Sequence, residues 1–397
     1  MKQHQKKIKR YRSSFNGKAE RGLLVKRIIG FIVLLAILFG LGWLLAKPGI
    51  ELGSKLWHEL KFGADNSTTA SSSAPKSPSS AVSSQSTAQD VSSVPVKAAQ
   101  NGSKGKWAYV AISSVSTPES AQNTARALKA DGFCAAVLEL KDARGFIYYQ
   151  SAIPIAQDSL SASTVDAAAV AKAFTDNGIT PIASISAFKD ASAPRTDKNI
   201  AVTYQDQKEF LWLNNKAEAG GVPWLNPYSD GAVTYITDIL NEVLTAGFKE
   251  VILSGVQFPS GYGLELAGYN TGADTRTKDA VLKDCVTKWQ TLCEENNAAC
   301  WFEYSSVAAL GEGDETTIAN PFTFGAKNIL LDFAASATKT DDITTLDSAL
   351  FNAAVSKAAA SSTVLSMRVS GGSLSGDALG AAANSALDAG FASACVR

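Results

Sequence analysis

Carboxylates at or just after the ends of apolar, strand-like segments are the residues of this chain best placed to do chemistry. They are Glu139, Asp142, Asp190, Glu303 and Asp332. Two facing carboxylates can cleave a glycosidic bond, with retention at about 5–5.5 Å separation and with inversion at ~6.5–9.5 Å. We therefore expect a catalytic pair in which Glu303 is the general acid, with Asp190, Asp142 or Asp332 as the second carboxylate.

Each of these acids also has a structural interpretation. Glu139 and Lys141 lie on the same side of one strand-like segment and could form a buried ion pair. Asp142 and Asp190 stand at strand-to-loop turns, where Asp often accepts hydrogen bonds from backbone N–H groups. Glu303 lies in an aromatic segment, where an acid without a partner is costly. The residue types alone leave both interpretations open.

Further polar and aromatic side chains near the same segment ends would suit a saccharide. The predicted binding residues are Glu139, Lys141, Trp224, Gln257, Tyr262, Tyr304 and Arg368. Aromatic rings offer large apolar faces to a ligand, but they serve as often to pack the loops that carry them. The alternative is therefore that about half of the aromatic residues are structural.

Histidine is absent from Lys106–Arg397, the region predicted to fold, since His4 and His58 both precede it. A Ser-His-Asp triad, a Cys-His pair and a His-ligated zinc or iron site are therefore excluded from Lys106–Arg397. The acids at Asp274 and at positions 312–315 are interpreted as solvated loop charges rather than calcium ligands. We predict no cofactor and no metal.

The cysteines indicate no redox motif. They are Cys134, Cys285, Cys293, Cys300 and Cys395, and no C-x-x-C pair occurs. Cys293 and Cys300 could meet across a helix-to-strand turn, but we favour buried thiols that act as small apolar side chains.

Eight strand-like segments alternate with helical ones after Lys106. The strands are predicted at Trp107–Ser113, Ala135–Lys141, Thr180–Phe188, Glu250–Phe258, Ala299–Ser305, Asn328–Phe333, Thr363–Val369 and Phe391–Val396. Helices are predicted at Pro118–Ala130, Ser163–Asn177, Gly231–Ala246, Thr277–Asn296, Thr345–Ala360 and Asp377–Ala389. This alternation predicts a (β/α)8 TIM barrel, an α/β fold whose active site lies at the carboxyl ends of the strands.

An open, doubly wound sheet is the alternative fold. It would carry a glycine-rich phosphate loop after the first strand, where this chain has Ser113–Thr117 instead. We therefore favour the barrel.

Four segments resemble the motifs of one bacterial family of glycoside-hydrolase-like TIM barrels. Gly247–Pro259 resembles G-F-D-E-I-Q-F-D-Y-I-R-F-P, and Val137–Gly145 resembles V-x-D-x-K-D-x-x-G. Ile182–Asp190 resembles a strand that ends in F-K-D, and Trp224–Pro227 resembles W-L-D-P. The matches fall in the family's order between Lys106 and Pro259. They imply the barrel fold and the glycoside-hydrolase-like family, but they are not specific for activity.

Three of the positions that depart from those motifs bear on the chemistry. Ser254 stands at the Asp of strand four, Gln257 at the Arg and Asn226 at the Asp of W-L-D-P. The resemblance implies an acid on strand four facing one on strand five. Glu303 could be the strand-five acid, whereas Ser254 cannot act as a carboxylate. Two functions follow, namely a glycoside hydrolase and an inactive barrel that binds saccharide or serves as a cell-envelope interaction domain.

The N-terminal region predicts a membrane anchor. Met1–Arg27 contains ten Lys or Arg residues and one acid, and Ile28–Ala46 is a run of nineteen uncharged residues. Such a helix spans about 28 Å, enough for the hydrocarbon core of a bilayer. The basic flank places the N-terminus in the cytoplasm. A cleaved signal peptide is the alternative, but the apolar run is long and no small-x-small site follows it.

A linker connects this anchor to the barrel. Residues 47–105 comprise a juxtamembrane segment and a Ser/Thr/Ala/Pro-rich stretch with few large apolar residues, which predicts disorder. The barrel is predicted at 106–397, where 21 basic and 32 acidic residues argue against nucleic-acid binding. We expect a single-pass cell-membrane protein whose extracellular domain binds a polysaccharide.

Overall fold

The computed structural model describes residues 102–310, 320–333, 348–369 and 376–396. The predicted tail at 1–27, the span at 28–46 and nearly all of the linker lie outside these residues. No helix within the described ranges is both long and apolar enough to cross a membrane. The predicted start of the barrel, Lys106, falls at the second residue of the first strand.

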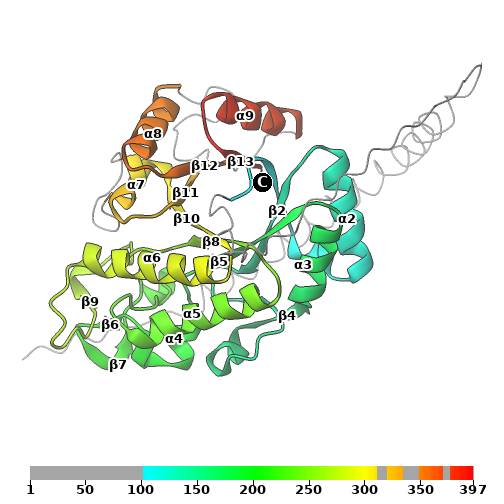
Figure 1. Ribbon diagram of the computed structural model, residues 1–397. Coiled ribbons are helices and arrows are strands. Elements are labelled where there is room, and N and C mark those ends of the chain that lie inside the picture. Colours follow the sequence, from blue (N-terminus) through cyan, green and yellow to red (C-terminus); the bar gives the residue numbers. More distant parts are fainter. Residues whose placement is uncertain (1–101, 311–319, 334–347, 370–375, 397) are drawn as a thin grey trace, which may run out of the picture. The chain divides into compact units, whose positions relative to one another are not determined.

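Eight parallel strands form a closed barrel, in the order β1-β2-β5-β8-β10-β11-β12-β13, and β13 pairs back to β1 (Figure 1). They are β1 (Gly105–Val110), β2 (Ala135–Lys141), β5 (Thr180–Ser186), β8 (Glu250–Ser254), β10 (Ala299–Ser305), β11 (Asn328–Asp332), β12 (Val364–Val369) and β13 (Ser393–Val396). An open sheet would leave two unpaired edges, so the closed order confirms the predicted (β/α)8 architecture.

Helices follow the barrel strands and cover the outer face of the barrel. They are α2 (Pro118–Ala130), α3 (Ala167–Asp176), α4 (Ala193–Thr196), α5 (Asp230–Thr245), α6 (Lys278–Glu295), α7 (Ser306–Leu310), α8 (Ser348–Ala360) and α9 (Gly376–Asp388). Thr117, Asp166, Ser229 and Thr277 accept backbone N–H groups at the starts of α2, α3, α5 and α6. These caps satisfy donors that a helix leaves unpaired, so the sequence sets the helix starts.

The predicted helix at Ser163–Asn177 is wrong at its start. Leu160–Val165 forms the strand β4, and the helix begins only after the cap Asp166. β4 pairs with β3 (Ile147–Tyr149), which itself pairs with β2, so this insertion extends the sheet beside the barrel.

Alternating side chains fill the barrel. Trp107, Val137, Ile252, Trp301 and other buried residues form one interior cluster, and the rings of Trp107 and Trp301 meet edge to face at 5.1 Å. The intervening side chains pack against the helices in a larger cluster. Since side chains alternate along a strand, residues two positions beyond this interior layer point to the same side, near the carboxyl ends.

The amino end of the barrel is covered by the incoming chain. Glu250, at the start of β8, accepts hydrogen bonds from the Ser103 N–H (2.7 Å), from the Ser103 hydroxyl and from Trp301 Nε1 (3.0 Å). The Ser393 hydroxyl donates to the Ser103 carbonyl. A Cβ on Gly102 would lie 2.4 Å from Trp301, so this close approach requires glycine. Gly102 and Ser103 therefore seal the end opposite the predicted site.

Two excursions at the carboxyl ends of β5 and β8 build a small second sheet. Its strands are β6 (Thr203–Tyr204), β7 (Gln207–Leu211) and β9 (Ala267–Gly268), in the order β7-β6-β9 (Figure 1). Val202, Trp212 and Trp224 form its own apolar cluster. Short 3₁₀ helices complete the connections at η1 (Ile112–Val115), η2 (Pro154–Ser159), η3 (Lys198–Ile200), η4 (Ala217–Ala219), η5 (Leu264–Leu266) and η6 (Pro321–Thr323).

The five cysteines form no disulfide within the described part of the chain. Cys285, Cys293, Cys300 and Cys395 are buried, as predicted, and Cys134 is half-buried. Burial raises the pKa of the Cys285 thiol to about 12, so it stays protonated at neutral pH.

Candidate active site

Glu303 lies inside the barrel near the carboxyl end of β10. It follows the interior residue Trp301 by two positions, and only 8% of its side chain is exposed. The Arg368 guanidinium, from β12, donates a hydrogen bond to its carboxylate. Arg368 also lies over the Tyr109 ring of β1, 5.4 Å from its centroid. Three strands that are far apart in sequence thus hold one buried acid.

Two further carboxylates act on the Glu303–Arg368 pair. Burial raises the pKa of Glu303, and Asp332 and Glu139 raise it further, although Arg368 opposes them. Burial disfavours the charge of Arg368, but Glu303 and Asp332 outweigh this effect and hold the pKa of the guanidinium above its ordinary value. We call Glu139, Glu303, Asp332 and Arg368 the mouth cluster. A buried carboxyl with a raised pKa can carry the proton that a general acid must donate.

The neighbour of Glu303 on strand four is a hydroxyl. Ser254 pairs in register with Glu303, and Ser186 pairs with Ser254 from the other side. Gln257 follows β8, and its amide lies 3.5 Å from the Phe258 carbonyl. The carboxylates that act electrostatically on Glu303 come from β11 (Asp332) and β2 (Glu139) instead.

Asp190 lies outside the mouth cluster, in a buried ion pair. Its Oδ2 is 2.8 Å from Lys141 Nζ, and both side chains are fully buried. Asp190 Oδ1 accepts the N–H groups of Ser192 (2.8 Å) and Ala193 (2.9 Å), and Lys141 Nζ donates to the Ser186 carbonyl (2.7 Å). These contacts hold the loop after β5 and leave neither residue facing a substrate.

The expected Glu139–Lys141 pair does not form. The register between β2 and β5 shifts between these residues, which directs Lys141 to Asp190. Such a bulge re-aims the side chains that follow it. Glu139 is left half-buried in the mouth cluster.

Asp142 stabilises a turn. Its Oδ1 accepts the N–H groups of Arg144 (2.9 Å) and Phe146 (3.0 Å). Its Oδ2 accepts from Arg144 Nε (2.8 Å) and from the Tyr148 hydroxyl (2.9 Å). With four donors on two oxygens, this carboxylate has the structural role that Asp commonly plays after a strand.

The three predicted aromatic binding residues differ in exposure. Trp224 is buried in the cluster of the second sheet. Tyr304 is also buried, because it follows the inward Glu303 by one position and so points to the helices. Tyr262 is 68% exposed on the loop after β8, with Lys216 Nζ 6.0 Å from its ring centroid. Of these three, only Tyr262 offers a ring to a ligand.

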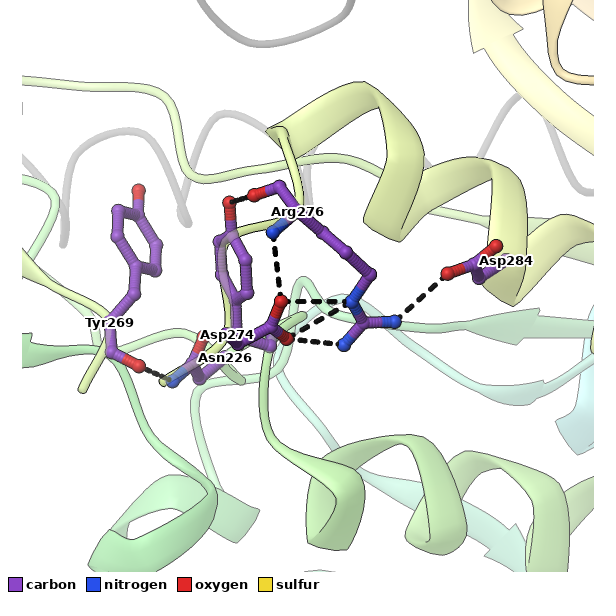
Figure 2. Close-up of polar contacts among 6 residues, drawn as sticks. Asn226, Tyr269, Asp274, Arg276 and Asp284 are labelled. Atoms are coloured by element: carbon purple, nitrogen blue, oxygen red, sulfur yellow. Dashed lines mark hydrogen bonds and ion pairs between the residues drawn. The ribbon is translucent and has the colours of Figure 1, made fainter. Parts of the chain in front are cut away.

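Asn226 ties together the loops that follow β5 and β8. Figure 2 shows its amide donating to the Tyr269 carbonyl at 2.7 Å. Its Oδ1 accepts the Tyr228 N–H at 3.0 Å. An aspartate could accept from Tyr228 but could not donate to Tyr269. The departure from W-L-D-P therefore has a structural reason in this chain.

Residues 108–304 match the model of a family described as "Putative glycosyl hydrolase domain". The chain carries a domain of this family. The match runs from β1 to the end of β10 and includes Glu139 and Glu303, whereas Asp332 and Arg368 follow it. No curated protein matches the sequence.

Solved structures with similar chains include a hypothetical protein from Ruminiclostridium thermocellum ATCC 27405, at 22% identity over 49% of this chain and 95% of that one, with a TM-score of 0.41. The catalytic domain of β-amylase from Paenibacillus polymyxa matches at 9% identity over 75% and 93%, with a TM-score of 0.47. An α-galactosidase from Thermus thermophilus matches at 10% identity over 74% and 57%, with a TM-score of 0.44. The barrel assignment rests on the strand order, not on these scores.

Sequence reasoning named every member of the mouth cluster but missed two of its neighbours. Tyr109 and Ser184 face the barrel interior near the same end, a placement that the alternation along β1 and β5 could have indicated. Among the described residues, no group of three or more His, Cys, Asp or Glu side chains could hold a metal ion.

Proposed function

We propose that the barrel hydrolyses a glycosidic bond of a cell-wall or extracellular polysaccharide, with Glu303 as general acid. The observation that carries the proposal is a buried carboxyl with a raised pKa at the carboxyl end of a barrel strand, next to two further acids. That end is where TIM-barrel enzymes hold their active sites. Membership in a glycosyl hydrolase domain family supports the same reaction.

In this mechanism Glu303 protonates the oxygen of the leaving sugar as the glycosidic bond breaks. In an inverting reaction Asp332 activates the attacking water as the bond breaks. In a retaining reaction Asp332 attacks the anomeric carbon instead, and water then hydrolyses the resulting glycosyl ester with Glu303 as the base. Glu139 is the alternative to Asp332 in either role. Arg368 holds the Glu303 carboxyl in place through their hydrogen bond. The proton that Glu303 gives up is restored from water, so the reaction consumes one water molecule for each bond cleaved.

The location of the reaction is also a proposal. We infer that Ile28–Ala46 anchors the chain in the cell membrane with the N-terminus in the cytoplasm, and that residues 47–105 tether the barrel outside. The charge distribution around the apolar run supports this orientation. A substrate on that side would be a polymer of the envelope or of the surroundings.

A catalytically inactive barrel that binds glycan is the second candidate. Ser254 favours it, because strand four places a hydroxyl beside Glu303 where the family motif has an acid. In that case the mouth cluster would bind sugar hydroxyls without cleaving the chain, or the domain would contact another envelope component.

The test uses the full chain in detergent micelles with a panel of wall and plant polysaccharides, and it scores both binding and release of reducing ends. Glu303→Gln should lower release about 10²- to 10⁴-fold, the usual contribution of a general acid. Glu265→Gln, an exposed acid on η5, is the control and should leave release unchanged. Binding without release by the wild-type protein would reject hydrolysis and favour the inactive barrel.

A further inference from the structure

A second polar pocket lies apart from the mouth cluster. Its volume is about 190 Å³, and its lining includes Lys198, Lys208, Asn226, Ser229 and Tyr269. These residues belong to the segments between β5 and α5 and between β8 and α6. Both segments leave the barrel at the carboxyl ends of neighbouring strands, on the side of the mouth cluster. We call it the lysine pocket.

The lysine pocket is rich in hydrogen-bond donors. Two ammonium groups line it, and its lining contains no carboxylate. Lys198 Nζ donates one hydrogen bond to the Glu209 backbone carbonyl at 3.0 Å. Lys208 is exposed, and its ammonium has no hydrogen-bond partner within the described part of the chain. An ammonium has three donors and no acceptor, so most of these donors remain available to a ligand.

Two of the side-chain acceptors that line the pocket are already in use. Asn226 Oδ1 accepts from the Tyr228 backbone, and the Ser229 hydroxyl accepts from Ala232 at the start of α5. Burial raises the pKa of Tyr269 to about 12, so its hydroxyl is a protonated donor at neutral pH. A sugar hydroxyl needs an acceptor as well as a donor, whereas an anion needs donors alone.

Nearby acids are held by other partners. Figure 2 shows Arg276 bound to Asp274 and to Asp284, at 2.5 Å and 2.9 Å between charged atoms. The Tyr228 hydroxyl donates to the Arg276 carbonyl at 2.9 Å, which ties this ion-pair network to the pocket wall. Asp206 accepts the backbone N–H of Asn270. The Asp274 and Asp284 carboxylates are thus held by Arg276, and neither they nor Asp206 line the pocket.

We propose that the lysine pocket binds an anionic group, a phosphate or a carboxylate, carried as a substituent on the glycan that the barrel takes. The glycan part of this inference rests on the proposed function. The pocket is smaller than the 300–1,000 Å³ or so typical of sites that enclose a whole ligand, so it suits one substituent of a longer chain. The protein would then select an acidic polymer over a neutral one.

The test measures calorimetric binding of poly(glycerol phosphate), polygalacturonate and dextran to the full chain in detergent. Lys208→Gln and Lys198→Gln should each weaken binding of an acidic polymer on the order of 10-fold, and more together, because each removes one charge-assisted contact. Lys283→Gln removes the same charge from an exposed position on α6 and should change nothing. Binding of the acidic polymer should fall as salt rises, and dextran should be insensitive to all three variants.

Two outcomes would overturn the inference. In one, Lys208→Gln and Lys283→Gln weaken binding equally, which would indicate diffuse charge attraction rather than a site. In the other, neither acidic polymer binds more tightly than dextran. Lys208-dependent binding of poly(glycerol phosphate) alone would identify phosphate, and that of polygalacturonate alone would identify carboxylate; either supports the site.

Failure of the hydrolase proposal gives a different pattern. Glu303 does not line the lysine pocket, so the dependence of binding on Lys208 is scored separately from the release of reducing ends. A protein that binds this polymer through Lys208 but releases no reducing ends would support the lysine pocket and reject the hydrolase proposal.

Discussion

Two buried glutamates stand on adjacent strands of the barrel at opposite ends, and their surroundings differ. Glu250 begins β8 at the sealed end, where Ser103 and Trp301 supply neutral donors. Glu303 lies near the carboxyl end of β10, where Arg368, Asp332 and Glu139 act on it. Burial raises the pKa of both carboxyl groups.

Under the proposed function, burial alone would not distinguish a catalytic acid from a structural one. Three donors hold Glu250 in one arrangement, and its carboxylate has little left to offer another molecule. Glu303 instead lies among Arg368, Asp332 and Glu139, which shift its pKa in opposite directions, an arrangement that is common at functional sites. We therefore propose a structural role for Glu250 and a chemical role for Glu303.

The largest effect on stability should come from Arg368→Met. Removing the cation leaves Glu303 buried without its partner, and breaking such a pair typically costs about 3–5 kcal/mol. Chemical denaturation at pH 8 measures the loss, with Arg368→Lys as the control that keeps a charge. A loss below about 1 kcal/mol would show that solvent already compensates Glu303.

Glu250→Gln should lower the free energy of unfolding by about 1–3 kcal/mol, because its amide group would face the Ser103 or Trp301 donor and leave it unpaired. Release of reducing ends should stay at the wild-type rate. The same denaturation and release assays check both parts. An intact fold with lost release would contradict the division between the two ends.

Glu250 should make the free energy of unfolding depend on pH. Its folded-state pKa is above the ordinary value, so the folded protein holds this proton more tightly than the unfolded chain. Glu250 therefore contributes fully to the free energy of unfolding at pH values below its pKa in the unfolded chain. This contribution is lost as the pH rises through its pKa in the folded protein. The stability deficit of Glu250→Gln should thus narrow with rising pH, by about 1.4 kcal/mol per unit of pKa shift. A stability deficit of Glu250→Gln that widens with rising pH would show that folding lowers the pKa of Glu250 instead of raising it.

The smallest effect is expected from Ser103→Ala, which removes one of the donors to Glu250 and keeps the backbone N–H. The loss should be about 0.5–1.5 kcal/mol, the net worth of one hydrogen bond. Thermal unfolding compares it with the larger loss in Glu250→Gln. A Ser103→Ala loss that exceeds the Glu250→Gln loss would mean that Ser103 acts through other contacts.

The barrel could be predicted because eight apolar segments alternate with helices in a regular order. The strands β3, β4, β6, β7 and β9 could not, since three of them have only two or three residues and several lie in polar loops. Pairing partners, rather than local pattern, make these segments strands.

The site was predictable where it follows strand alternation. Glu303 and Arg368 point inward because they continue the faces of Trp301 and Val364. The same parity places Tyr304 outward. The Lys141–Asp190 pair depends on a register shift between two strands, which no single-chain pattern encodes.

The central claim, that Glu303 donates a proton to the leaving group, is tested most directly by varying that group. Glu303→Gln should lose about 10²- to 10⁴-fold in rate on the polysaccharide that the wild-type protein cleaves. On an aryl glycoside of the same sugar whose leaving group needs no proton, the loss should be far smaller. Equal losses on both substrates, or no loss on the polysaccharide, would contradict the assignment of Glu303 as the general acid.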